Sequence, residues 1–231
     1  MRDPDHADAG ELELVIGSKN HSSWSLRPWL LLAGSDIPFR EVRVPYHLLD
    51  WHARIRALSP NGRVPALRHG GVVVSESIAI LEYVAELHPE RGLWPESRAA
   101  RAIARSLAAE VHAGFAALRR DLDMNVSARL SPGPLPDETR ADQARLEQIW
   151  AERLDASGGP YLFGRFGAVD AMFAPFACRF VTYGVTPGPA GARFMEAVLG
   201  LPAMQRWIAD AARETADEPA VSGPGQPLQS A

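Results

Sequence analysis

The chain has 231 residues, 46% of them apolar, and a net charge of −4 at pH 7. It is long enough for one large or two small domains with an ordinary hydrophobic core. The negative charge and the lack of a basic run argue against nucleic acid as a partner. No apolar run reaches the roughly 18 residues of a membrane span, and residues 1–10 lack the apolar centre of a signal peptide.

Cysteine and histidine usage excludes several kinds of site. Cys178 is the only cysteine, which excludes an intramolecular disulfide, a Cys-x-x-Cys redox pair and a cysteine-based zinc site. The seven histidines show no metal-ligand spacing, so we expect no metal. This usage fits a reducing cytoplasm. Lys19 is the only lysine, which we interpret as compositional bias without functional content.

The N-terminal part alternates strand and helix signals. Residues 12–16 predict a strand, residues 25–33 a helix that ends at Gly34, and residues 39–44 a second strand. These elements form a β-α-β unit. A less regular segment, residues 45–58, follows.

A hairpin and a helix complete this part of the chain. Residues 64–68 and 72–74 flank a turn with two glycines and predict two antiparallel strands. Ser75 is then expected to cap a helix with a broad apolar face. The order β-α-β, irregular segment, β-β-α is that of a thioredoxin-like domain, which we place at residues 11–89.

Beyond Pro95 the strand signals stop and helical periodicity takes over. Leu107, Val111, Phe115, Leu118 and Leu122 form one apolar stripe, which predicts a single long helix. Further helices are predicted over residues 137–155, 169–183, 192–199 and 203–213. We therefore expect a linker at 89–95, an all-helical domain at 96–214, and disordered tails at 1–10 and 215–231.

Several hydroxyl side chains lie between the first expected strand and the first expected helix, within residues 20–29. Free backbone N–H groups and the positive end of the helix dipole favour an anion at such a junction, and the anion could be a thiolate. The alternative is an ordinary N-cap, since serine caps helices well and Pro28 lies early in the helix, where its missing N–H matters little.

Two further signals suggest ligand contacts in the same part of the chain. A proline that opens a strand, in Val64-Pro65, leaves the N–H and C=O of its neighbour free to pair with an extended ligand, and a cis bond would turn them outward. The alternative is an edge-strand proline. In Glu76-Ser77 the hydroxyl could hold a carboxylate while Glu76 accepts from an ammonium group. The alternative is a capping serine beside an acidic first-turn residue.

In this order and spacing the signals resemble the glutathione S-transferases. Residues 22–27, Ser-Ser-x-Ser-x-Arg, are similar to the helix start of a serine-type bacterial member and are closest to the zeta class. Residues 61–67 resemble the family's loop and cis-proline segment, and residues 75–80 its glutamate-serine helix start. Residues 167–171 resemble the buried capping motif, although Gly167 stands where the family has serine or threonine, so Asp170 is expected to carry more of the local hydrogen bonding.

The resemblance implies a thioredoxin-like domain joined to an all-α domain, with glutathione as co-substrate and no metal. A seryl O–H would donate to the glutathione thiol and favour the thiolate, which attacks a small hydrophobic electrophile. Ser23 is our first candidate for this donor, and Ser22 is the alternative. The expected glutathione-binding residues are Trp24, Arg27, Arg63, Val64, Pro65, Glu76 and Ser77. The expected electrophile-binding residues are His112, Phe115, Arg119, Met124, Phe180 and Tyr183.

The family resemblance also implies a cytoplasmic homodimer with a role in detoxification. Two other functions stay open: a glutathione-dependent isomerase or dehalogenase, and a non-catalytic binding protein on the same fold. Two differences argue against the isomerase activity of the zeta class. That class has cysteine where this chain has Trp24, and it has a basic substrate-holding residue near residues 181–183, where this chain has Val-Thr-Tyr. A glutaredoxin-like reductase is not expected, because serine stands at the position of its cysteine.

Overall fold

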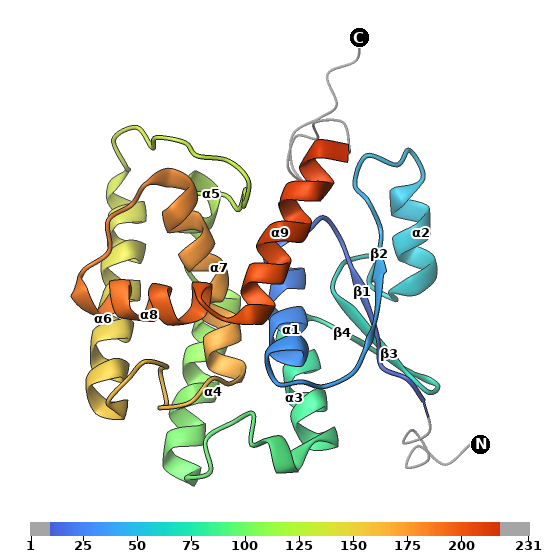
Figure 1. Cartoon of the computed structure of the whole chain (residues 1–231), viewed down its shortest axis with the longest axis horizontal. Coiled ribbons are helices and arrows are strands. Elements are labelled where there is room, and N and C mark those ends of the chain that lie inside the picture. The colour runs from blue at the N-terminus through green and yellow to red at the C-terminus, as the bar shows by residue number, and fades with distance from the viewer. Residues whose placement is uncertain (1–9, 218–231) are drawn as a thin grey trace.

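A mixed four-stranded sheet organises the N-terminal part of the computed structural model, which describes residues 10–217 (Figure 1). Its strands are β1 (Glu13–Ile16), β2 (Arg40–Arg43), β3 (Ala66–His69) and β4 (Val72–Ser75), in the order β2-β1-β3-β4. β1 pairs parallel with β2 and antiparallel with β3, and β3 pairs antiparallel with β4. This order confirms the predicted thioredoxin-like arrangement.

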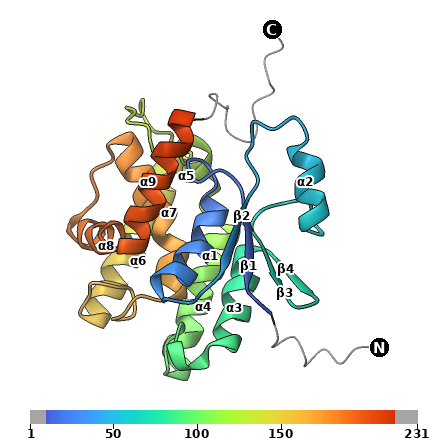
Figure 2. The same cartoon turned by 45° about the vertical axis from the view of Figure 1, so that its right-hand side comes forward.

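Helices cover both faces of the sheet. α1 (Ser23–Gly34) and α3 (Ser77–Leu87) lie on one face, and α2 (Trp51–Leu58) lies on the other (Figure 2). β1 is buried along its whole length, as expected of a central strand covered on both sides. The core on the α1 and α3 side continues into the helical region, whereas only a small apolar cluster lies under α2.

The rest of the described chain is helical. α7 is buried over nearly its whole surface and packs against α1, α4 and α8, so it forms the centre of this region. α9 returns to contact α1 of the first part (Figure 1). The helical elements are η2 (Pro89–Arg91), α4 (Arg98–Ala113), α5 (Ala116–Asp121), α6 (Asp137–Ser157), α7 (Ala168–Tyr183), α8 (Pro189–Leu199) and α9 (Pro202–Asp217).

None of the helices within residues 10–217 is long and apolar enough to cross a membrane. Two of the predicted elements differ from the structure. The segment 45–58 is not irregular throughout, because α2 occupies its second half; this helix buries only Ile55, so its sequence carries almost no apolar periodicity. The predicted long helix is broken between α4 and α5, where Gly114 ends α4 and Phe115 has a φ of +56°. The apolar stripe nevertheless stays buried across the break.

Two predicted helix boundaries also change. Ser75 is the last residue of β4 and caps nothing; α3 begins at Ser77, and Glu76 takes the N-cap position with a φ of +71°. α9 extends to Asp217, so the predicted C-terminal tail does not start at Thr215. The other residues of the two predicted tails, 1–9 and 218–231, lie outside the described residues.

The start of α7 explains the glycine that departs from the family's capping motif. Asp170 accepts hydrogen bonds from the backbone N–H groups of Gly167 and Leu162, both at 2.9 Å, as expected from the sequence. Burial raises the pKa of this carboxyl to about 7. A Cβ atom at position 167 would lie 2.6 Å from the carbonyl oxygen of Leu93. Glycine is therefore required by the close approach of that carbonyl.

Candidate functional site

The candidate site lies where the N-termini of α1 and α3 meet the loop that precedes β3. α1 and α3 pack side by side on one face of the sheet. Each begins shortly after a strand, so its first backbone N–H groups have no partner within the helix. The N-terminus of α1 also faces α7 of the helical region. Helix N-termini favour anions.

Ser22 is the N-cap of α1. Its Oγ accepts from the backbone N–H of Ser25 at 3.3 Å and donates to the Oγ of Ser25 at 2.7 Å. The Oγ of Ser25 in turn accepts from the N–H of Gly17 at 3.2 Å. The capping interpretation therefore holds for Ser22, and its hydroxyl hydrogen is already used within the protein.

Ser23 has a different environment. It is the first residue of α1 and is 5% exposed. Its Oγ accepts from Nη2 of Arg179 at 3.3 Å. Within the described part of the chain its own hydroxyl hydrogen is not used in a hydrogen bond. Of the two adjacent serines, Ser23 is therefore the one with a free donor.

Three guanidinium groups surround the start of α1. Arg27 is fully buried and donates to the carbonyl oxygens of Ser23 and Met172, each at 3.0 Å. Its guanidinium lies 4.0 Å from the centroid of the Trp24 ring, and that of Arg119 lies 5.3 Å away. Arg179, the third, is also buried.

None of these three arginines forms an ion pair with a carboxylate among residues 10–217. Burial, and then the charges of Arg179 and Arg119, lower the pKa of Arg27 well below its ordinary value. Burial lowers the pKa of Arg179 to about 10, so this side chain stays protonated at neutral pH. The charges of Asp123 and Asp142 act on Arg179 and Arg119 without forming ion pairs. Three guanidinium groups against two carboxylates leave positive charge, which favours an anion beside Ser23 and lowers the pKa of a thiol placed there.

Sequence reasoning missed Arg179. It lies within the apolar stretch of α7, two positions before residues 181–183, the segment near which a basic residue was expected in the zeta class. A basic residue inside a largely apolar helix is a signal that the sequence does contain.

The loop before β3 is tied to the start of α3. The Val64-Pro65 bond is cis, as hypothesised. The strand pairing of β3 begins at Ala66, so the N–H and C=O of Val64 lie outside the described ladders. Asn61 donates to Glu76 at 3.2 Å and accepts from the N–H of Arg63 at 2.9 Å. Glu76 thus lies at the edge of this loop.

Ser77 has an unusual buried hydroxyl. The residue is 1% exposed, and its Oγ has no hydrogen-bond partner among the described residues. A buried polar atom without a partner is destabilising by about 1–3 kcal/mol. Together with the free N–H groups at the start of an 11-residue helix, this hydroxyl fits an acidic group of a ligand.

The expected electrophile-binding residues fall into two groups. Phe115, Met124 and Phe180 are 5%, 2% and 0% exposed and belong to the main hydrophobic core.

His112, Arg119 and Tyr183 are only partly buried. His112 packs edge-on against Trp24, with ring centroids 5.4 Å apart, and its Nδ1 is buried with no hydrogen-bond partner among residues 10–217. The hydroxyl of Tyr183 donates to Asp123, and burial followed by this contact raises its pKa to about 12. These three side chains remain candidates for contact with a second substrate.

Among residues 10–217, no group of three or more His, Cys, Asp or Glu side chains is placed to hold a metal ion.

Comparison with known proteins identifies relatives. Residues 21–87 match the family model of the glutathione S-transferase N-terminal domain. Maleylacetoacetate isomerase of Rattus norvegicus is 28% identical over 85% of this chain and 92% of its own length. Glutathione S-transferase Z2 of Arabidopsis thaliana is 27% identical over 89% and 94%.

Solved structures show the same fold. A glutathione transferase homolog from Burkholderia, crystallised with bound glutathione, superposes with a TM-score of 0.67 at 23% identity and covers 89% of this chain and 99% of its own. Ure2p in complex with S-p-nitrobenzylglutathione gives 0.67 at 18% identity, over 86% and 94%. The architecture is that of the glutathione transferases, and residues 21–87 are similar to the N-terminal domain of that family.

Proposed function

We propose that this chain, which has the glutathione transferase fold, binds glutathione and uses Ser23 to hold the thiol as a thiolate for attack on a small hydrophobic electrophile. The observation that carries the proposal is the unused O–H of Ser23, which lies at a helix N-terminus beside the buried guanidinium of Arg179. In this proposal residues 11–89 bind glutathione and residues 96–214 contribute the electrophile site.

The binding residues are proposed from their unpartnered groups. Ser77 and the first N–H groups of α3 hold the carboxylate of the γ-glutamyl end, and Glu76 accepts from its ammonium group. Val64 pairs with the cysteinyl backbone through groups that the sheet leaves free. Arg63, Trp24 and Arg27 border this path.

The electrostatics of the site support thiolate formation. A free cysteine thiol has a pKa of about 8.5. A hydrogen bond to a charged group contributes about 1.5–3 kcal/mol, and about 1.4 kcal/mol corresponds to one pKa unit. The hydroxyl of Ser23, with the neighbouring positive charge, is therefore sufficient to bring a bound thiol to a pKa near neutrality.

Calorimetry with glutathione tests the binding site. We expect Glu76→Ala and Ser77→Ala each to weaken binding by about 1.5–3 kcal/mol, because each removes a contact to a charged ligand group. Ser97→Ala is the control, since Ser97 is also a serine at a helix start but lies outside the site, as the N-cap of α4. Unchanged affinity in both site variants, with the fold intact by circular dichroism, would contradict the assignment.

The guanidinium cluster favours a second candidate, a glutathione-dependent isomerase of a carboxylate-bearing substrate. Arg119 and Arg179 lack paired carboxylates and could hold such a group, and one relative is named maleylacetoacetate isomerase. Loss of thiol during turnover separates the two, because conjugation consumes glutathione and isomerisation or dehalogenation with glutathione release does not. A non-catalytic binding protein would show neither thiol loss nor turnover.

The proposal also covers the oligomeric state, the cellular location and the biological role of the protein. We propose a cytoplasmic homodimer with a role in detoxification, on the strength of the family resemblance. Sedimentation of the purified chain would measure its oligomeric state directly.

A further inference from the structure

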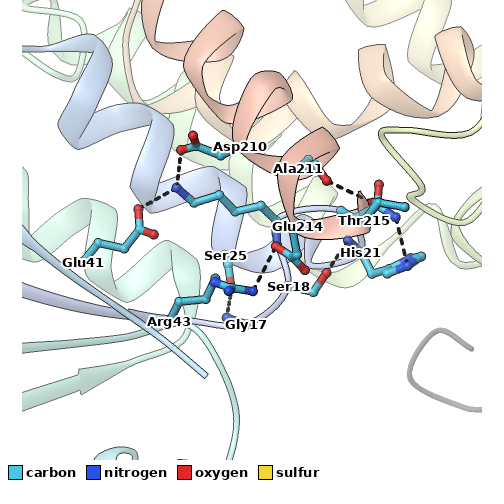
Figure 3. Close-up of polar contacts among 12 residues, drawn as sticks. Gly17, Ser18, His21, Ser25, Glu41, Arg43, Asp210, Ala211, Glu214 and Thr215 are labelled. Atoms are coloured by element: carbon cyan, nitrogen blue, oxygen red, sulfur yellow. Dashed lines mark hydrogen bonds and ion pairs between the residues drawn. The ribbon is translucent and has the colours of Figure 1, made fainter. Parts of the chain in front are cut away.

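The segment between β1 and α1, residues 17–22, is held by the C-terminal helix. The backbone N–H of Lys19 donates to Oε2 of Glu214 at 2.7 Å, and its Nζ donates to Oδ2 of Asp210 at 2.7 Å. Both carboxylates come from α9, about 190 residues further along the chain. Figure 3 shows Asp210 and Glu214 reaching from α9 toward the segment that contains Gly17 and Ser18.

The ammonium group of Lys19 lies in an enclosed cage. The residue is 5% exposed, and its Nζ also contacts Oε2 of Glu41 at 2.8 Å. It lies 4.9 Å from the ring centroid of Trp29 and 5.5 Å from that of Trp207. Burial raises the pKa of Asp210, but the hydrogen bonds and charges of Lys19 and then of Arg213 together outweigh this effect, and the pKa is lowered.

A buried charge with paired carboxylates has little freedom, because movement away from them leaves charges without partners in a low-dielectric interior. Lys19 is therefore fixed at both its backbone and its side chain. The only lysine of the chain therefore has a structural role, which differs from the compositional bias inferred from the sequence.

The constraint reaches the serines within a few residues. The carbonyl oxygen of Ser18 accepts from the N–H of Ser22 at 2.8 Å, and its Oγ accepts from the N–H of His21 at 3.2 Å. Asn20 anchors the other side of the segment, where its Oδ1 accepts from the N–H of Ser127 at 2.9 Å. A displacement of Lys19 would therefore be passed to the start of α1.

We propose that Lys19, clamped by Asp210 and Glu214 of α9, is a positioning residue that sets the orientation of the Ser23 hydroxyl. The inference rests on the proposed function of Ser23. It assigns to α9 a part in the chemistry, although neither Lys19 nor the two carboxylates touch the bound thiol. Removal of the clamp therefore changes the thiol pKa and turnover, and leaves glutathione affinity, which depends on the start of α3, unchanged.

The test measures the pKa of enzyme-bound glutathione from the ultraviolet absorbance of its thiolate. In Lys19→Met the pKa is expected to rise by about one unit and turnover well below that pKa to fall about tenfold, with recovery at high pH. Glutathione affinity measured by calorimetry is expected to stay the same. Arg206→Met is the matched control, because Arg206 is an α9 cation that lies 5.9 Å from the Trp29 ring centroid and is not hydrogen-bonded to residues 17–22.

A second pair of variants keeps the test decisive if Lys19→Met does not fold. Glu214→Gln keeps an acceptor for the N–H of Lys19, whereas Glu214→Leu removes it. The leucine variant is expected to raise the thiol pKa and to speed amide hydrogen exchange at Ser22 and Ser23, and the glutamine variant to stay near the wild type.

The outcomes separate this inference from the proposed function. A wild-type protein that does not lower the pKa of bound glutathione contradicts the proposed function. A wild-type protein that lowers it, with the same pKa in Lys19→Met and Glu214→Leu, overturns the positioning role alone. Faster exchange at Ser22 without a change in pKa also overturns it, because the clamp would then be only structural.

Discussion

Alanine substitution of the two adjacent serines at the start of α1 is expected to change different properties: the thiol pKa for Ser23 and the stability of the fold for Ser22. Ser23→Ala removes a hydroxyl whose hydrogen is free to donate to the thiolate. One such bond contributes about 1.5–3 kcal/mol, so the pKa of bound glutathione is expected to rise by about one to two units. At a pH well below that pKa, the thiolate fraction and the conjugation rate fall about 10- to 100-fold.

Ser22→Ala is expected to affect stability instead. It removes the N-cap of α1, a change that lowers the free energy of unfolding by about 0.5–2 kcal/mol. It also removes the donor to Ser25. The thiol pKa is expected to stay at the wild-type value, because the Ser22 hydroxyl hydrogen is directed to Ser25 and not to a ligand.

The assay is the pH profile of conjugation with a chromogenic electrophile, together with the absorbance titration of the bound thiolate and urea unfolding of each variant. The defect of Ser23→Ala should shrink as the pH rises, because the thiol then ionises without help. A profile shifted by Ser22→Ala but not by Ser23→Ala would refute the assignment. A profile shifted by neither would leave both hydroxyls with a capping and packing role only.

Three further predictions concern the framework of the site. Burial raises the folded-state pKa of Asp170 to about 7, so the stability that this residue contributes is complete below pH 4 and is lost as the pH rises through 7. Relative to Asp170→Asn, the free energy of unfolding should fall by about 1.4 kcal/mol per pH unit between these limits. A difference between the two proteins that does not change with pH would contradict the raised pKa. Gly167→Ala should lower the free energy of unfolding by about 1–3 kcal/mol, because its Cβ meets the carbonyl oxygen of Leu93; a variant as stable as the wild type in urea would show that α7 can shift. Phe180→Ala should lower it by about 3–5 kcal/mol as a core residue, whereas a normal urea midpoint with an altered KM for the electrophile would instead place Phe180 in the substrate site.

Local chemistry and periodicity were enough to predict the elements and the main ligand-contact signals of the N-terminal part. The order of strands and helices predicted the thioredoxin-like sheet, because alternation and turn residues report local structure. The serines at the start of α1, the Val64-Pro65 step and the Glu76-Ser77 helix start all lie where short-range signals predicted them. α2 escaped prediction because a helix that buries only Ile55 carries almost no apolar pattern.

The sequence did not show which of these groups have a hydrogen-bond donor available for a ligand, because that depends on contacts seen in the folded protein. Ser22 and Ser23 are adjacent and chemically identical, and they differ because Ser25 uses one hydroxyl hydrogen while Arg179, 156 residues away in sequence, donates to the other oxygen and leaves its hydrogen free. Lys19 likewise gains its role from carboxylates on α9. The contacts of Arg179 and of Lys19 are set by the packing of α7 and α9 on α1, and spacing within a single segment carries no information about them.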